Sequence, residues 1–386
     1  MSRLVLCACM LCLPWLTLAD DAGAVHVLAG PEVKPIHDAL QRLKRPFSPI
    51  EKLSRDGLAG CRVLILCGTK PPVDEAGKRV VEAFLQEGGA VLAVGGGATC
   101  MIDHKLVDAT GYYLTGTTIH MTSFQGYHRL TFGYPGAKPV GNWKSGVSSL
   151  LRATEGPLMM PGPKATSILR CDSAGHSAAI IQRVGKGLAL LIGPDPQGGN
   201  AYYELNKPKL QPGDKLKTDR LLDNAVAFLL DPHTNVIPNS GFEENTKLAK
   251  EFSNWQITLK NGAKSEWCTQ DAPEGKQFVK IVCPEAKSSG VVQPTRPIVV
   301  EAGRRYRFTC RYRSNGTWRL KVDARREKPP KQDPLPPKAM PESAAWQQFA
   351  AEMDIPPDVS YVLITATKHD KGELCLDDVT LQLMPR

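Results

Sequence analysis

Apolar runs alternate with amphipathic stretches over residues 24–231, which predicts an α/β domain of the Rossmann-like, flavodoxin-like type. Residues 62–68 and 90–94 are continuous apolar runs, as expected of parallel strands that are buried on both faces. Between them, residues 73–87 repeat apolar side chains at helical spacing, and Gly88 ends the predicted helix. Strand, helix and strand in this order predict a βαβ unit.

Weaker signals extend this pattern toward both ends of the domain. The stretch 111–163 is rich in Gly, Pro, Tyr and Thr and predicts no regular element. Pro232 ends the last helix, because a proline cannot continue it. The further predicted elements are strands at 25–30, 177–183 and 188–192, and helices at 36–43 and 218–230.

From residue 235 to residue 386 the pattern changes to short, evenly spaced runs with no amphipathic helix between them. Such a pattern predicts an all-β sandwich of the jelly-roll type. Residues 328–341 are rich in Lys and Pro and predict a long exposed loop. The predicted strands include 278–282, 306–312, 318–322, 361–365 and 379–383.

Residues 1–19 have the layout of a secretory signal peptide. Arg3 precedes an apolar stretch that runs from Leu4 to Leu18, and Ala19 offers a small residue for cleavage. The stretch is too short to span a bilayer, its cysteines sit too early for a lipoprotein signal, and no later segment is long and apolar enough for a membrane span. We therefore expect an exported protein, periplasmic or extracellular, without a transmembrane segment.

The net charge of +9 is spread along the 386 residues, with its densest basic cluster between Arg304 and Arg326. The basic residues there accompany strand-like residues, which predicts a solvated strand face, and we expect no nucleic-acid partner. Contact with an acidic polysaccharide remains open.

Three of the 11 cysteines lie in the signal segment, and the others show no C-x-x-C pair and no zinc spacing. Export permits disulfides. In the second domain the candidate pairs are Cys268 with Cys283, or Cys310 with Cys375, and the sequence does not fix the connectivity.

Three motifs of the first domain occur in a set order: GGAVLAVGGG at 88–97, HRLTFG at 128–133 and VGKGLALLIGPDPQ at 184–197. Together they resemble the class I glutamine amidotransferase-like superfamily, in particular the group of biotin–protein ligase N-terminal and ThuA-like domains. The resemblance covers most of residues 24–231 and implies an amidotransferase-like fold.

The resemblance also implies that the catalytic residues are missing. Active members carry a cysteine nucleophile where Gly95 stands, and a His and a Glu where Asp195 and Gln197 stand. Gly95 has no nucleophilic atom, Asp195 is a poor base near neutral pH, and Gln197 cannot stabilise an imidazolium. The turn of Gly95, Gly96 and Gly97 still lies at the carboxyl end of a parallel strand, where α/β folds bind small molecules or anions.

Two displaced sites would instead make the protein a secreted hydrolase or a sugar-processing enzyme. In the first, Cys100 acts as a shifted nucleophile beside Asp103 and His104. In the second, His120 and His128 hold a metal ion. The alternatives are an inward-packed cysteine and structural histidines, and we adopt these.

The second domain opens with NVIPNSGFEE at 235–244 and closes with LDDVTL at 376–381. These two ends resemble a carbohydrate-binding module of the family 4/9, galactose-binding-like group. That family often holds a structural calcium ion, and Glu243 and Asp378 match carboxylate positions that supply oxygen ligands. A plain hydrogen-bonding role explains both carboxylates equally well.

Sugar binding requires an exposed aromatic face that stacks on a pyranose ring. The candidates are Trp267, Trp318 and Trp346, and a core position is the alternative for each. Trp318 follows Asn315-Gly316 and is expected near an exposed hairpin tip. The sequence thus predicts an exported, catalytically silent protein that binds polysaccharide, glycan or cell-envelope material and uses no catalytic cofactor.

Overall fold

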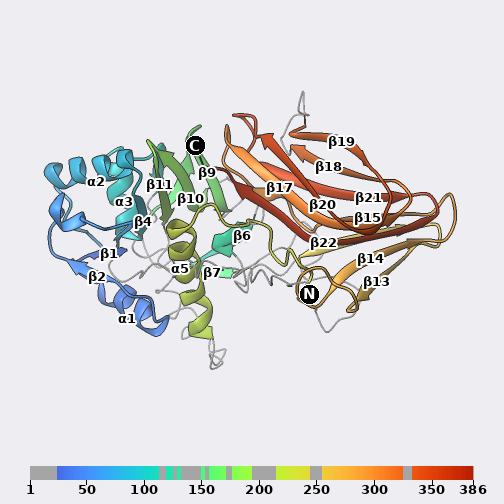
Figure 1. The fold of residues 1–386 in the computed structure, drawn as a ribbon. Helices are drawn as coiled ribbons and strands as arrows, with labels where there is room; N and C mark the ends of the chain where they lie inside the picture. The colour runs from blue at the N-terminus through green and yellow to red at the C-terminus, as the bar shows by residue number, and fades with distance from the viewer. Residues whose placement is uncertain are drawn as a thin grey trace, which may run out of the picture.

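The computed structural model describes residues 24–112, 119–124, 128–131, 149–152, 156–170, 176–193, 214–243, 254–324 and 333–385. The predicted signal segment, Asp195 and Gln197 lie outside the described residues. Two bodies lie side by side, an α/β domain and a β-sandwich (Figure 1).

A mixed sheet of 11 strands forms the centre of the first domain, in the order β2-β1-β3-β4-β11-β10-β9-β6-β7, with β5 and β8 off this path. Strands β2, β1, β3, β4 and β11 pair in parallel, whereas β10 and β9 run antiparallel to their neighbours. The Rossmann-like arrangement is therefore confined to one half of the sheet. The strands are Val25–Leu28 (β1), Ser48–Ile50 (β2), Val63–Leu66 (β3), Ala90–Val94 (β4), Ala109–Tyr112 (β5), Ile119–Phe124 (β6), Ser149–Arg152 (β7), Leu158–Pro161 (β8), Ala165–Arg170 (β9), Ser177–Val184 (β10) and Gly187–Ile192 (β11).

Helices cover both faces of the parallel half. Helices α1 (Lys34–Arg42) and α5 (Asp214–Leu230) share one core, and α2 (Glu75–Glu87) and α3 (Gly96–Asp103) share the other. Strands β3 and β4 contribute alternate residues to the two cores, which explains why their sequences are continuous apolar runs. The Asp74 carboxylate caps α2 by accepting the Gly77 N–H at 2.7 Å. Short 3₁₀ turns cover Asp56–Leu58 (η1) and Arg129–Thr131 (η2).

The second domain is a β-sandwich of two antiparallel sheets around one core. The six-stranded sheet has the order β12-β15-β21-β18-β19, with β16 paired to β21, and the five-stranded sheet has the order β13-β14-β22-β17-β20. The strands are Trp255–Lys260 (β12), Lys264–Cys268 (β13), Phe278–Cys283 (β14), Ser289–Pro294 (β15), Ile298–Val299 (β16), Arg305–Asn315 (β17), Trp318–Ala324 (β18), Leu335–Met340 (β19), Ser343–Asp354 (β20), Tyr361–His369 (β21) and Gly372–Leu383 (β22).

Two expectations for this domain are wrong. The predicted loop at 328–341 contains β19, an edge strand, and edge strands tolerate prolines such as Pro336 and Pro337 because one side of the backbone needs no ladder. The described cysteines are all free thiols. Cys310 faces the core while Cys375 lies between the core residues Leu374 and Leu376 and so faces outward, which keeps these two thiols on opposite sides of their sheet. Cys283 likewise belongs to the core, whereas Cys268 alternates with the core-packed Trp267.

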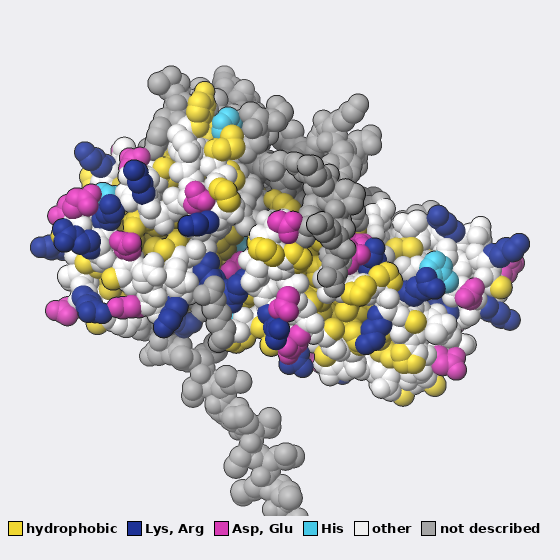
Figure 2. Space-filling model, turned by 90° about the horizontal axis from the view of Figure 1, so that it is seen from above, with side chains coloured by type: hydrophobic (Ala, Val, Ile, Leu, Met, Phe, Trp, Pro, Cys, Tyr) yellow, Lys and Arg dark blue, Asp and Glu magenta, His cyan; other side chains and the backbone are white. Residues whose placement is uncertain are grey.

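No helix within the described ranges is long and apolar enough to cross a membrane. On the face drawn in Figure 2, Lys and Arg side chains are interspersed with Asp and Glu over both domains. The basic residues therefore do not form a single positively charged patch on that face.

Candidate functional site

The turn after β4 has the backbone of an elbow without a nucleophile. Gly95 has φ 59° and ψ −121°, a conformation that L side chains rarely adopt, and α3 begins at the next residue. A β-carbon on Gly96 would collide with the carbonyl oxygens of Gly68 and Thr69, and one on Gly97 would collide with that of Leu66. The close approach of α3 to the sheet thus requires both glycines. Whether this turn binds a ligand remains a prediction.

The surroundings of Cys100 on α3 do not suit a displaced nucleophile. Burial, and then the Asp103 charge, raises the pKa of the Cys100 thiol to about 11, so the thiol stays protonated at neutral pH. The His104 Nε2 lies 3.1 Å from the Val73 carbonyl oxygen, and Nδ1 lies 3.6 Å from a Glu75 carboxylate oxygen. These contacts tie the imidazole to the start of α2, which is a structural role.

His128 also has a structural position. It is 4% exposed, its ring packs edge-on against Phe228 at 4.6 Å, and Nδ1 accepts the Leu130 N–H at 3.1 Å. Burial lowers the pKa of His128 to about 3, so its imidazole is neutral. The side chain of His120 lies outside the described residues. In the part of the chain that the structure describes, no three His, Cys, Asp or Glu side chains converge on a metal position.

The three candidate tryptophans have different environments. Trp318 lies at the β17–β18 hairpin as expected, but it is 1% exposed and packs against Tyr312, so the prediction that it is accessible is wrong. Trp267 is half-buried and packs against the sandwich core. Trp346 is half-buried on the opposite, outward side of the five-stranded sheet.

Strand β17 presents mostly polar side chains on the outer face of the five-stranded sheet. In β17, buried residues alternate with outward side chains, which are Arg305, Arg307, Thr309, Arg311 and Arg313. On this face Thr309 shares a hydrogen bond of 2.6 Å with Thr380, and Ala350 is the cross-strand neighbour of Thr309. Small side chains therefore lie between two groups of larger ones.

Trp346 closes one end of this outer face. Its Nε1 donates to the Asp271 carbonyl oxygen at 2.9 Å, and its ring lies 5.1 Å from Phe278 and 5.4 Å from the Arg313 guanidinium carbon. Phe278 belongs to β14, which β22 and β17 separate from β20. A register irregularity after Tyr312 accompanies this reach of Trp346 across the sheet.

The opposite end of the outer face carries paired charges. The Arg305 guanidinium binds both carboxylate oxygens of Asp354, at 2.9 and 3.1 Å. Within the described chain the neighbouring Arg307 has no ion-pair or hydrogen-bond partner for its exposed guanidinium. Arg307 is thus a donor group that remains available to a ligand.

Of the predicted calcium carboxylates, Asp378 lies at the register irregularity between β17 and β22, and Glu243 belongs to the segment before β12. Glu243 accepts the backbone N–H groups of Lys276 and Gln277, at 2.6 and 3.0 Å, and Asp378 lies 3.9 Å from Arg311. Sequence reasoning overlooked the neighbour of Asp378. Asp377 is 0% exposed, and its Oδ2 has no hydrogen-bond partner among the described residues.

The pKa of Asp377 is raised to about 7, mainly by burial and to a smaller extent by the charges of Asp378 and Glu243. A β-carbon on Gly241 would lie 3.7 Å from the Glu243 Cγ and 3.8 Å from the Asp377 Oδ1. A buried carboxylate oxygen without a partner among the described residues suits a hard cation such as calcium, whose other ligands would be further oxygen atoms. The fit therefore favours Asp377 over Asp378 as the partner of Glu243.

No family model and no curated protein matches this chain. Its structural neighbours include TmCBM61 in complex with β-1,4-galactotriose (18% identity, TM-score 0.31, covering 39% of this chain and 99% of that one). They also include the CBM22-1 xylan-binding domain of Xyn10C from Paenibacillus barcinonensis (17%, 0.28, 38% and 93%). A third is the enzymatically active domain of tailspike protein 4 of bacteriophage CBA120 (12%, 0.33, 39%), of which this chain spans only 21%. Likenesses this distant identify no ligand, and the β-sandwich assignment rests on the strand order itself.

Proposed function

We propose that this protein is exported, lacks catalytic activity and binds a glycan on the outer face of the five-stranded sheet. The observation that carries the proposal is Trp346, a half-exposed indole at the end of a strip of arginine, threonine and glutamine side chains. Sugars present apolar C–H faces and many hydroxyls, so an aromatic ring beside hydrogen-bonding side chains suits them. Export is supported by the signal-like pattern of residues 1–19.

The first domain supports a binding role without chemistry. At the elbow, Gly95 offers no nucleophilic atom, and the nearby Cys100 is held as a neutral thiol. His104 and His128 are both engaged in structural contacts. These residues were the candidates for a hydrolase, and none of them has an arrangement suited to acid–base or nucleophilic catalysis.

Replacing Trp346 by alanine tests the proposed site. The mature chain, residues 20–386, is titrated with a panel of neutral and acidic oligosaccharides by isothermal calorimetry. We expect Trp346→Ala to weaken binding at least about tenfold, which corresponds to ~1.4 kcal/mol, because the stacking surface is lost. Arg307→Ala should weaken the same binding through lost hydrogen bonds.

Tyr112→Ala is the matched control, because Tyr112 is an aromatic residue 51% exposed on the first domain. It should leave affinity unchanged. Wild-type affinity in Trp346→Ala, or no binding to any glycan by the wild type, would contradict the proposal. Release of reducing sugar from the panel would favour the enzyme alternative.

We further propose that the β-sandwich binds calcium through Asp377 and Glu243. Calcium at about 1 mM should raise the thermal midpoint of the mature chain relative to EDTA, with a stabilisation of ~1–2 kcal/mol if the dissociation constant is about a tenth of that concentration. Asp377→Asn should abolish the calcium dependence, whereas Glu352→Gln, an exposed carboxylate on the same sheet, should retain it. Equal midpoints for the wild type in calcium and in EDTA would exclude the metal.

A further inference from the structure

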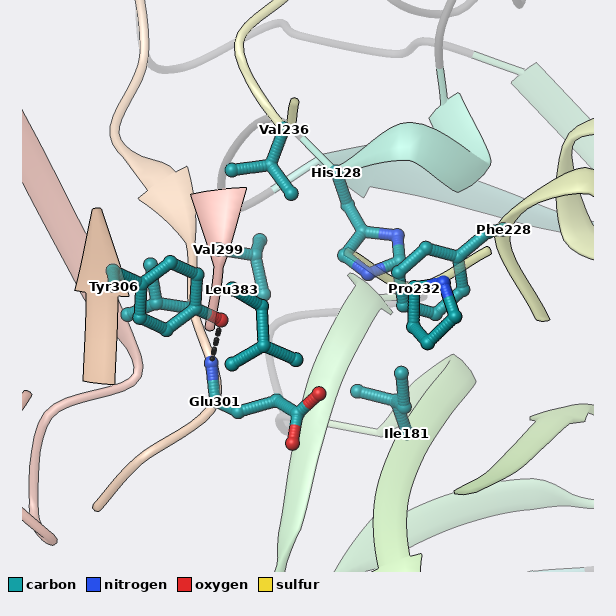
Figure 3. A pocket seen from close by; sticks show the side chains of 10 residues that line it. His128, Ile181, Phe228, Pro232, Val236, Val299, Glu301, Tyr306 and Leu383 are labelled. Carbon is teal, nitrogen blue, oxygen red and sulfur yellow. Dashed lines mark hydrogen bonds between the residues drawn. The ribbon is translucent and has the colours of Figure 1, made fainter. Parts of the chain in front are cut away.

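Buried side chains of both domains line one small cavity at the junction between them. The cavity among these side chains has a volume of about 10 Å³, barely enough for one water molecule, so it admits no ligand. Figure 3 shows side chains of both domains pointing into this junction. From the first domain come Ile181 and Phe228, and from the β-sandwich come Val299, Tyr306 and Leu383, all of them at most 3% exposed.

A desolvated ion cluster crosses the junction. The Arg183 guanidinium of β10 donates to both carboxylate oxygens of Glu301, from Nε at 2.8 Å and from Nη2 at 2.9 Å. Arg304 of the β-sandwich donates to the same carboxylate at 3.4 Å. The side chains of Arg183, Glu301 and Arg304 are 18%, 14% and 10% exposed. Removing one member of such a poorly hydrated ion pair is strongly destabilising, because the remaining charge is left without compensation.

One further hydrogen bond crosses the junction, and two others hold the connecting segment to the sandwich. The Tyr361 hydroxyl of β21 donates to the Ser167 carbonyl oxygen of β9 at 3.0 Å. In the connecting segment, His233 Nδ1 lies 2.9 Å from the Leu383 carbonyl oxygen, and the Val236 N–H donates to Leu381 at 2.9 Å. The connection therefore belongs to the sandwich instead of forming a free linker.

We propose that the first domain stabilises the β-sandwich by covering part of its core, and that the two domains fold as one cooperative unit. Tyr306 and Leu383 belong to the sandwich core and also to the junction, so this core is complete only when the first domain covers it. The Glu301 carboxylate likewise receives its two shortest arginine hydrogen bonds from Arg183 of the first domain. This role is independent of glycan binding and gives the first domain a function that requires no nucleophile.

Differential scanning calorimetry of the mature chain tests the proposal. The wild type should unfold in a single transition. Glu301→Gln removes the carboxylate that Arg183 and Arg304 share, and it should separate the transition into two or lower its midpoint by several degrees. Asp354→Asn is the matched control, because it breaks an ion pair with Arg305 in which the Asp354 side chain is 72% exposed. It should leave one transition near the wild-type midpoint.

A gentler variant covers the case in which Glu301→Gln does not fold. Tyr361→Phe removes only the hydroxyl that reaches Ser167, and it should lower the midpoint of the one transition without splitting it. Two independent transitions in the wild type would overturn the proposal. It would also be overturned if Glu301→Gln behaved like Asp354→Asn, or if Tyr361→Phe moved the unfolding of one domain alone.

Discussion

Replacing Trp318 by alanine is expected to lower the free energy of unfolding by about 3–5 kcal/mol, the usual range for removing a large buried aromatic side chain. Trp318 is 1% exposed, its ring lies 5.1 Å from that of Tyr312 in an edge-to-face arrangement, and it shares the core with Leu320. Alanine would leave a cavity in the centre of the sandwich, where the two sheets cannot easily close over it.

Urea unfolding, followed by circular dichroism, measures this effect. Trp318→Phe is the control, because it keeps an aromatic ring and removes an indole N–H that is buried without a partner among the described residues. It should cost much less than alanine. Trp346→Ala should also cost less, because its ring is only half-buried. If Trp318→Ala unfolded at the wild-type midpoint but lost glycan affinity, the assignment of the two tryptophans would be reversed.

Acid is expected to weaken the protein through His128. The folded-state pKa is lowered to about 3 by burial, from an ordinary value of 6.5. Above pH 6.5 the imidazole is neutral in both states, and its contribution to stability is fully present. Between pH 6.5 and 3 only the unfolded chain takes up the proton, so stability falls as pH falls, by at most ~1.4 kcal/mol per pH unit.

His128→Asn isolates this contribution, because asparagine keeps an acceptor for the Leu130 N–H and does not titrate. The free energy of unfolding is measured in urea at pH 7 and pH 5 for both proteins. The wild type should lose about 2 kcal/mol more than the variant over this interval. Carboxylates contribute equally to both proteins, so equal losses would show that His128 is accessible to protons in the folded state.

The parallel half of the first domain follows from its sequence because each strand is buried on both faces. The apolar runs at 62–68 and 90–94 become β3 and β4, and the helix predicted at 73–87 becomes α2, with Asp74 and Gly88 as its caps. Strands β5 to β8 could not be predicted, because these short strands have mixed patterns and owe their pairing to partners far away in the chain. The same holds for β19, whose prolines suggested a loop.

The candidate site was predicted only in part, although some of the missing signals were present. Trp318, Leu320 and Val322 alternate, which places Trp318 on the core side together with two aliphatic residues. The same alternation separates Cys310 from Cys375. The role of Trp346 depends on a strand irregularity, and the burial of Asp377 depends on the loop that carries Glu243. Neither feature has a local sequence signal.

The central claim is that a glycan binds the outer face of the five-stranded sheet. Hydrogen–deuterium exchange of the mature chain, with and without a saturating concentration of the best-binding oligosaccharide from the panel, locates the bound ligand directly. We predict slower exchange in β17 and β20 and in the loop around Asp271, with no change at Gly95–Gly97. Protection confined to the Gly95 turn, or no protection in the five-stranded sheet, would contradict the account.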